Sequence, residues 1–360
     1  MLEILEDEPL APRTTLGIGG RAKLFATVHD EAELREAALA ARARGLPLFV
    51  LGGGSNLLVS DRGLDALVVR LRITSFDVDE SPDGVRFAVG AGYAWDEVVA
   101  RSVAAGCAGL ECLSGIPGDT GATPIQNVGA YGQEVSETIA AVEALELATG
   151  EAVRLEPEAC AFGYRMSAFK HAMRGLFVVT RVHFRLRPGG PAKVAYPELA
   201  RALGEATPSL AHVRDTVLRL RRAKSMVLDA SDENAKSAGS FFTNPIVDSD
   251  VAERARDAAR AMGQGGMPEF AAGEGKTKLS AAWLIERAGF ARGTTRGRVG
   301  ISTKHSLALV NKGGASASEL VAFALEVQQG VADHFGVRIT PEPELVGFDP
   351  GEIASLVATT

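Results

Sequence analysis

The alternation of apolar and polar positions predicts a chain of short strands mixed with amphipathic helices. Apolar runs of strand length, most of them bounded by glycine or proline, lie at 47–51, 57–59, 67–71, 85–89, 139–147, 152–155, 176–187, 307–311 and 337–340. Helix-forming segments, several of them beginning at Asp or Ser, lie at 30–44, 95–105, 197–225, 250–262, 280–288 and 316–334. Because the two kinds of element do not alternate strictly, the pattern predicts the α+β class.

Two glycine-rich loops interrupt this pattern. The first, Gly52-Gly-Gly-Ser-Asn56, follows the apolar run 47–51 directly. The second covers 116–132, where 17 residues contain four glycines, two prolines and a single charge, Asp119. Proline lacks a backbone donor and glycine costs backbone entropy, so this segment suits neither a helix nor a central strand. Its backbone N–H groups, without a Cβ in front of them, suit a phosphorylated ligand, and a merely structural loop is the alternative.

Neither glycine-rich segment fits the common nucleotide-binding fingerprints. A dinucleotide fingerprint that starts at Gly52 needs glycine at 57, where the chain has Leu57, and no helix follows. Gly275-Lys276-Thr277 resembles the end of a P-loop, but the leading glycine falls on Phe270. The Rossmann and Walker interpretations are therefore both excluded.

Composition limits the class of protein. A chain of 360 residues suggests two or three domains, and 46% hydrophobic with 23% charged residues is typical of a globular protein. The net charge of −7 argues against a nucleic-acid partner. The acidic N-terminus is unlike a signal peptide, and no apolar run approaches the roughly 20 residues that span a bilayer. Three cysteines without a CxxC pair predict reduced, mostly buried thiols in a cytoplasmic protein.

Six separated stretches, in this order, resemble one enzyme family. They are Leu51–Asn56, 116–132, Phe162–Lys170, Gly239–Pro245, Lys278–Glu286 and Ile339–Glu342. Together they resemble the UDP-N-acetylenolpyruvoylglucosamine reductases, flavin enzymes of peptidoglycan precursor synthesis, over roughly 13–347. A single glycine-rich loop would be a weak signal, whereas an ordered set of this kind is highly specific.

The resemblance implies a bipartite FAD-binding region of the vanillyl-alcohol-oxidase (PCMH) type and a C-terminal α+β substrate-binding domain. We expect FAD-binding subdomains at 1–71 and 72–224 and the substrate domain at 225–342, with the tail 343–360 as a candidate to pack on the first subdomain. The resemblance also implies that FAD is bound by Gly52, Gly53, Gly54, Ser55, Asn56, Pro117, Gly118, Thr120, Gly121, Thr123, Gln126, Asn127 and Gly129. Of these, Gln126, Asn127 and Gly129 would lie near the isoalloxazine.

The implied reaction is the reduction of an enolpyruvyl ether of a UDP-sugar, with hydride delivered from NADPH through the flavin. Negative charge then builds up on the carbon that bears the carboxylate and on the carboxylate itself, so the site should hold cations or acids aimed there. The resemblance implies that Arg165 pairs with the carboxylate, that a protonated Glu342 hydrogen-bonds to it, and that Ser240 donates the proton. Glu344 is the alternative to Glu342, because the final motif departs from its usual form here.

The resemblance also implies a set of substrate contacts. These are Tyr196 and Lys224 at the diphosphate, Asn244 at the nucleotide sugar, Tyr164 on the uridine or pyrophosphate side, and His305 at the enolpyruvyl carboxylate. Small molecules are therefore the expected partners of a monomer, with no metal, nucleic acid or membrane involved.

Two other functions remain open from the sequence. One is an oxidase or dehydrogenase of the same flavin superfamily, many of which attach the flavin through His or Cys. The candidates for such attachment, His29, Cys107 and Cys112, lie outside both glycine loops, so we expect FAD to be non-covalent. The other is a non-catalytic module that binds flavin or UDP-sugars, which would not need Arg165, Ser240 and Glu342 together.

Overall fold

A computed structural model describes residues 2–81, 84–204 and 207–358. The chain forms two compact units: Met1–Glu8, Ala22–Gly53 and Asp65–Leu228 form the first, and Pro9–Arg21, Gly54–Leu64 and Asp229–Thr360 form the second. Two short N-terminal segments thus fold with the C-terminal part of the chain. The three domain boundaries expected from the sequence stay a prediction.

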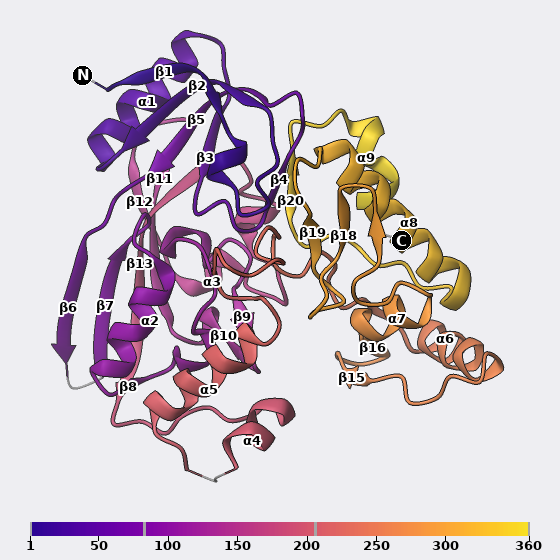
Figure 1. Cartoon of the computed structure of the whole chain (residues 1–360). Coiled ribbons are helices and arrows are strands. Elements are labelled where there is room, and N and C mark those ends of the chain that lie inside the picture. The colour runs from indigo at the N-terminus through magenta and orange to yellow at the C-terminus, as the bar shows by residue number, and fades with distance from the viewer. Residues whose placement is uncertain (1, 82–83, 205–206, 359–360) are drawn as a thin grey trace. The chain divides into compact units, whose positions relative to one another are not determined.

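A four-stranded sheet and one helix begin the first unit. The strand order is β1 (Ile4–Pro9), β2 (Arg21–Val28), β5 (Leu64–Leu71), β3 (Leu48–Leu51), with β3 and β5 parallel. Helix α1 (Glu31–Ala43) connects β2 to β3 (Figure 1). The Asp30 carboxylate accepts a hydrogen bond from the Glu33 N–H, which fixes the start of α1. Its apolar face, which includes Leu34 and Ala37, is buried.

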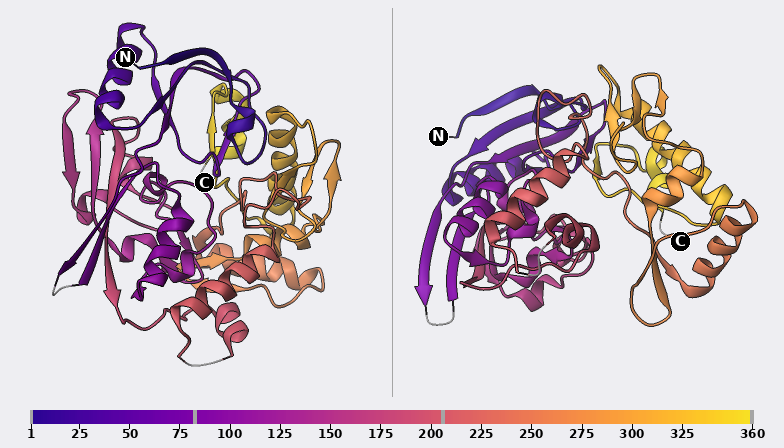
Figure 2. Two further views of the ribbon diagram at one scale, coloured as in Figure 1. Left: turned by 60° about the vertical axis from the view of Figure 1, so that its left-hand side comes forward. Right: turned by 60° about the horizontal axis from the view of Figure 1, so that its bottom comes forward.

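A larger antiparallel sheet also contributes to the core of the first unit. Its order is β12 (Ala152–Leu155), β11 (Ile139–Glu146), β13 (Phe177–Pro188), β7 (Gly84–Gly90), β6 (Phe76–Ser81), and β8 (Cys107–Ala108) pairs with the end of β13. Figure 2 shows β6 and β7 side by side as long purple arrows. Helix α2 (Trp95–Ala104) packs here, with the rings of Trp95 and Phe184 5.7 Å apart.

The predicted helix 197–225 is wrong as one element. The structure has two helices, α4 (Pro197–Leu203) and α5 (Leu210–Arg222), and residues 205–206 lie outside the described part. Gly204 has φ 69°, a left-handed conformation that ends α4. The Ser209 hydroxyl accepts a hydrogen bond from the His212 N–H and starts α5 anew.

Helix α8 (Ala317–Phe335) is the centre of the second unit. Helices α6 (Ser249–Ala261), α7 (Ala281–Arg287) and α9 (Pro350–Val357) contact it (Figure 1). Ser316 and Glu319 form a capping box at the start of α8. Two small antiparallel sheets complete the unit, with the orders β14 (Ile246–Asp248), β16 (Lys276–Leu279), β15 (Glu269–Ala271) and β17 (Thr295–Arg296), β18 (Val299–Ile301), β19 (Leu309–Asn311).

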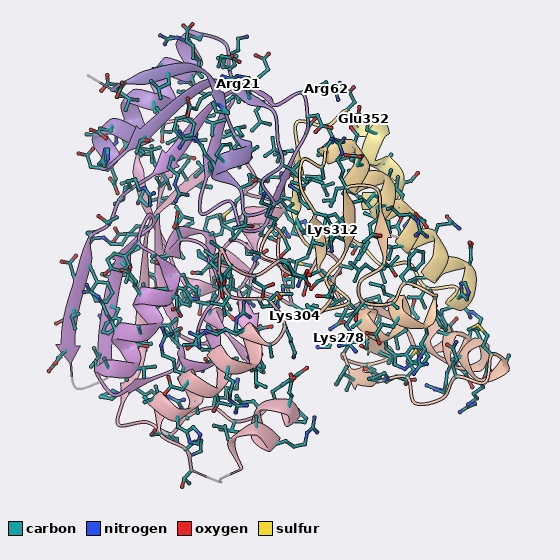
Figure 3. All side chains as sticks on the ribbon, viewed as in Figure 1. Arg21, Arg62, Lys278, Lys304, Lys312 and Glu352 are labelled. Carbon is teal, nitrogen blue, oxygen red and sulfur yellow. The ribbon has the colours of Figure 1, made fainter. Side chains whose placement is uncertain are left out.

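The C-terminal strand lies later than predicted. We expect a strand at 337–340, but β20 is Glu344–Val346 and pairs in parallel with β4 (Leu57–Val59). Pro341 and Pro343 lack N–H donors, so regular pairing begins only after them. The tail is held further because the Arg62 guanidinium bonds to Asp349 and, at 2.8 Å, to Glu352 (Figure 3).

The other predicted elements have their expected type, with ends shifted by a few residues. The remaining short elements are α3 (Pro157–Cys160), β9 (Gly129–Ala130), β10 (Gln133–Glu134) and 3-10 turns at Ala11–Arg13, Glu111–Leu113, Thr120–Ala122, Val135–Glu137 and Ala168–Lys170. Among the described residues, no helix combines the length and apolarity that crossing a membrane requires.

Candidate active site

The two predicted glycine loops contact each other through their backbones. A Cβ on Gly53 would lie 2.6 Å from the Cα of Gly118, so the first loop has no room for a side chain at Gly53. A Cβ on Gly121 would lie 2.5 Å from the Cβ of Ala91, whose carbonyl oxygen accepts from the Gly121 N–H at 2.9 Å. Next to Gly52 the nearest atom to such a Cβ lies 3.9 Å away. The loops therefore form one backbone surface that stays accessible beside Gly52.

A buried ion pair, missed by the sequence analysis, connects the first loop to the second. The Arg70 guanidinium lies 2.9 Å from the Asp119 carboxylate and also donates to the carbonyl oxygen of Leu51 at 3.4 Å. Burial raises the pKa of Asp119, and the nearby Arg70 partly opposes this rise. The single charge within the otherwise uncharged loop 116–132 was the signal that could have revealed this pair.

Several polar residues predicted to bind FAD hold the second loop in shape. The Thr120 hydroxyl donates to the Tyr93 carbonyl at 2.9 Å, and the Thr123 hydroxyl donates to the Thr120 carbonyl at 2.8 Å. Asn127, with φ 44°, is 1% exposed, and its amide donates to Glu134 at 2.8 Å and to the Gly163 carbonyl at 2.9 Å. These side chains are thus engaged by the protein itself. Pro117, Gly118, Gln126 and Gly129 are half-buried along the same loop.

The last part of the first loop packs within the second unit. Gly54 has φ 63°, and a Cβ there would lie 2.1 Å from the carbonyl oxygen of Arg13. Ser55 is half-buried beside it. The Asn56 amide donates to the Glu342 carbonyl at 3.4 Å, and the Asn56 carbonyl accepts from the Glu344 N–H at 3.0 Å. Asn56 therefore positions the segment that carries both candidate glutamates.

Arg165 extends from a strained turn towards the end of the second loop. Its φ of 55° is uncommon for a residue with a side chain. One guanidinium nitrogen donates to the Gly129 carbonyl at 2.8 Å, and the guanidinium carbon lies 5.4 Å from the centre of the Tyr164 ring. A Cβ on Gly129 would come within 3.1 Å of the guanidinium. Three predicted site residues thus lie together in the first unit.

Tyr196 and Lys224 also meet in the first unit, through two residues that the sequence analysis did not identify. The rings of Tyr131 and Tyr196 contact edge to face at 5.7 Å. Lys224 pairs with Glu198 at 2.7 Å, and its Nζ lies 5.9 Å from the centre of the Tyr131 ring. Burial raises the pKa of Tyr131 to about 12. An aromatic residue inside a glycine-rich loop was the available signal for Tyr131.

In the second unit, the structure brings Ser240, His305 and Glu342 together. The Phe241 N–H donates to the Leu307 carbonyl at 2.7 Å, and the Phe241 carbonyl accepts from the Glu342 N–H at 2.8 Å. The segment after Ser240 therefore lies between the segment that carries His305 and the segment that carries Glu342. The Ser240 hydroxyl is 3.4 Å from Nε2 of His305.

Asn244 is used at the start of a helix. Its side-chain oxygen accepts from the Ala281 N–H at 2.9 Å, and the Ser280 hydroxyl accepts from the Trp283 N–H. These two bonds satisfy backbone donors at the start of α7. The structure thus gives Asn244 a helix-capping role. Its contact with the substrate stays a prediction.

The three cysteines are free and buried, as predicted. Burial raises the pKa of Cys112 to about 12 and that of Cys160 to about 11. The Cys112 thiol lies 3.1 Å from the Lys193 carbonyl oxygen. These thiols are packed side chains with little thiolate at neutral pH.

Family models match both parts of the chain. The model of the C-terminal domain of UDP-N-acetylenolpyruvoylglucosamine reductase matches residues 231–346, and that of an FAD-binding domain matches residues 22–156. These matches confirm the predicted fold class, an FAD-binding region followed by a C-terminal α+β domain.

Whole proteins of the same name are similar over nearly the full chain. The reductase of Streptomyces coelicolor is 48% identical over 95% of this chain and 90% of its own length, and that of Nocardia farcinica is 50% identical over 94% and 88%. The crystal structure of the reductase from Thermus caldophilus, 28% identical, superposes with a TM-score of 0.64 over 96% of this chain and 98% of its own. The chain belongs to the UDP-N-acetylenolpyruvoylglucosamine reductase family.

Proposed function

We propose that this protein is an FAD-dependent reductase that uses NADPH to convert the enolpyruvyl ether of UDP-N-acetylglucosamine into UDP-N-acetylmuramate for peptidoglycan synthesis. The observation that carries this proposal is the 48% sequence identity to a reductase of this name over 95% of this chain and 90% of that protein, across both the FAD-binding and the C-terminal parts. A small-molecule substrate and NADPH are therefore the partners. We further propose that the enzyme acts in the cytoplasm as a monomer.

The glycine loops fit the phosphate groups of FAD. Gly53 and Gly121 have no room for a Cβ, and the backbone beside Gly52 stays open to a ligand. Backbone N–H groups in such a surface can bind a pyrophosphate without any cationic side chain. Bound there, FAD would supply the transfer of hydride from NADPH to the double bond of the substrate. The residues named for FAD in the sequence analysis are retained as the proposed contacts.

Arg165 is proposed to bind the carboxylate of the enolpyruvyl group. A guanidinium is charged at every physiological pH and can engage a carboxylate with two parallel hydrogen bonds. Its hydrogen bond to the Gly129 carbonyl fixes the direction of the side chain. Charge that builds up on the carboxylate during reduction would strengthen the pairing, so Arg165 would stabilise the transition state more than the ground state.

Ser240 is proposed to donate the proton that completes the reduction. The carbon next to the carboxylate becomes strongly basic when hydride has been added to its neighbour, so even a weak acid can protonate it when held in place. Both backbone groups of Phe241, the residue after Ser240, are hydrogen-bonded, and this fixed backbone supports the proposal. Glu342 lies on one of the two segments that flank Phe241. We propose that Glu342, in its protonated form, donates a hydrogen bond to the substrate carboxylate.

Tyr196 and Lys224 are proposed to bind the diphosphate of the substrate. The Lys224 ammonium is held 2.7 Å from the Glu198 carboxylate. A phosphate that binds there would either share the ammonium with Glu198 or displace Glu198 from it. Tyr196 is 39% exposed and rests edge to face on Tyr131, which leaves it accessible to a ligand. Asn244 and Tyr164 remain proposed substrate contacts.

One anaerobic experiment tests the whole proposal. The purified holoenzyme is mixed with NADPH while the flavin absorbance is followed, and the enolpyruvyl UDP-sugar is then added. The proposal predicts bleaching, then recovery of the oxidised spectrum together with UDP-N-acetylmuramate. Bleaching without recovery would mean that the reduced flavin passes its electrons to an acceptor other than the enolpyruvyl UDP-sugar. A purified protein without flavin would refute the cofactor assignment.

A further inference from the structure

His305 lies beside the proposed proton donor rather than in an isolated position on the surface. Its Nε2 is 3.4 Å from the Ser240 hydroxyl oxygen. This is longer than a tight hydrogen bond of about 2.8 Å, but catalytic hydrogen bonds are often long before the substrate complex forms and tighten within it. The pair is partly buried, where a hydrogen bond has more effect than in water.

The loop that carries His305 is fixed by a dense set of hydrogen bonds. The Ser302 hydroxyl accepts from the N–H of Lys304 at 3.1 Å and of His305 at 3.3 Å. The side chain of Asn234, which is 0% exposed, accepts from the Thr303 N–H and donates to the Thr303 hydroxyl, both at 3.0 Å. These bonds fix the backbone that carries His305.

The chemistry of Ser240 explains why such a neighbour is useful. When the Oγ–H bond of Ser240 breaks, the proton forms the new C–H bond and the electron pair stays on Oγ as an alkoxide, until a solvent proton restores the hydroxyl. A serine hydroxyl is a poor acid because this alkoxide is unstable. An N–H donor aimed at Oγ stabilises the alkoxide and so makes the serine a stronger acid.

We propose that His305 is a positioning residue for Ser240: its Nε2–H donates to Oγ, directs the serine proton towards the substrate and stabilises the alkoxide that forms. This inference rests on the proposed reductase function, and it assigns His305 to the proton donor rather than to the substrate carboxylate. The two assignments differ in what they predict. A carboxylate contact would mainly raise the KM for the UDP-sugar, whereas a partner of Ser240 would mainly lower the rate of the step that the sugar drives.

The test uses anaerobically NADPH-reduced holoenzyme and follows reoxidation by the enolpyruvyl UDP-sugar. His305→Ala should slow the maximal rate of reoxidation by about 100-fold, the lower end of the range for the loss of one such donor. The rate of flavin reduction by NADPH and the sugar concentration at half-maximal rate should change little. His305→Gln keeps an N–H donor and should recover most of the lost rate. Lys304→Ala, on the same loop but paired with Asp232 at 2.8 Å (Figure 3), is the matched control and should behave as the wild type.

A double variant separates this inference from the proposed function. In a Ser240→Ala background the partner of Oγ has nothing left to act on, so adding His305→Ala should change the residual rate less than twofold. Additive losses, or a loss in His305→Ala that appears only as a weaker apparent affinity for the sugar, would overturn the role proposed for His305. A Ser240→Ala enzyme that reoxidises normally would instead refute the role of Ser240 itself.

Discussion

The backbone N–H of Glu342 donates a hydrogen bond to the carbonyl oxygen of Phe241 at 2.8 Å. Phe241 follows Ser240 directly, so this bond holds one candidate glutamate in register with the proposed proton donor. Glu344 instead donates its N–H to the Asn56 carbonyl at 3.0 Å and begins strand β20. The structure thus gives a physical reason to prefer Glu342 over Glu344, a choice that the sequence leaves open.

The first prediction follows from this register. Glu342→Gln should slow reoxidation of the reduced enzyme by the enolpyruvyl UDP-sugar by about 100-fold, the lower end of the range for a lost acid or transition-state donor. Reduction of the flavin by NADPH should stay nearly intact, because the negative charge on the substrate that Glu342 is proposed to stabilise develops only in the later step. Stopped-flow absorbance of the flavin measures the two half-reactions separately.

Glu344→Gln is the matched control for that experiment. It makes the same chemical change two residues later, on a strand that pairs with β4. It should leave both half-reactions close to the wild type. The opposite result, a slow Glu344→Gln and a normal Glu342→Gln, would show that the register assigned to the final motif is wrong.

The second prediction concerns the diphosphate. Tyr196→Phe removes a hydroxyl but keeps the ring that rests on Tyr131, so the fold should be unaffected. The apparent affinity for the UDP-sugar should fall about 10-fold, as expected for a lost hydrogen bond to a charged group of about 1.5 kcal/mol. Steady-state kinetics at varied substrate measure this. An unchanged apparent affinity would reduce Tyr196 to a packing residue.

The third prediction tests the contact between the glycine loops. Gly53→Ala would place a Cβ 2.6 Å from the Cα of Gly118, backbone that can move only if the loop shifts. The variant should therefore be purified with much less FAD, as measured by the ratio of absorbance at the flavin band to that of the protein. Gly265→Ala adds a methyl group where no atom lies within 4 Å and should keep its flavin. Equal flavin content in both variants would contradict the model of a shared loop surface.

Individual residues show how far the sequence determines this picture. The glycine loops and the stretches that contain Ser240 and the two candidate glutamates were identifiable as candidates because their motifs are local and ordered along the chain. The roles of these residues stay a prediction. The pairing of Arg70 with Asp119 and the contact of Tyr131 with Tyr196 join residues that are 49 and 65 positions apart, so a local pattern can draw attention to one residue of each pair but not to its partner. The break near Gly204 was missed because the helical pattern continues on both sides of it. Gly204 ends α4 in a left-handed conformation, and the cap at Ser209 starts a separate helix, α5.

The fourth prediction concerns the buried thiols and the flavin. Cys112 is 0% exposed and its pKa is raised to about 12, mainly by burial, so the native thiol should react slowly with an alkylating reagent at neutral pH. Unfolding should expose all three thiols to rapid reaction.

Acid precipitation should release all of the flavin into the supernatant. Flavin that stays with the pellet would show a covalent link and favour an oxidase of the same superfamily.

The fifth prediction is a dependence of stability on pH that arises from Asp96. Burial by itself would raise the pKa of Asp96, but hydrogen bonds from Arg214 and from the Gly115 N–H outweigh it, and the pKa is lowered below 3.8. A carboxylate with a lowered pKa stabilises the folded state above its unfolded pKa, and this contribution is lost as the pH falls through the folded pKa. Wild type should therefore unfold at a higher temperature than Asp96→Asn near neutral pH, and the difference should shrink below about pH 4. Thermal unfolding from about pH 3 to about pH 7 measures it. A difference that stays constant over the whole range would mean that packing, and not the charge of Asp96, supports the start of α2.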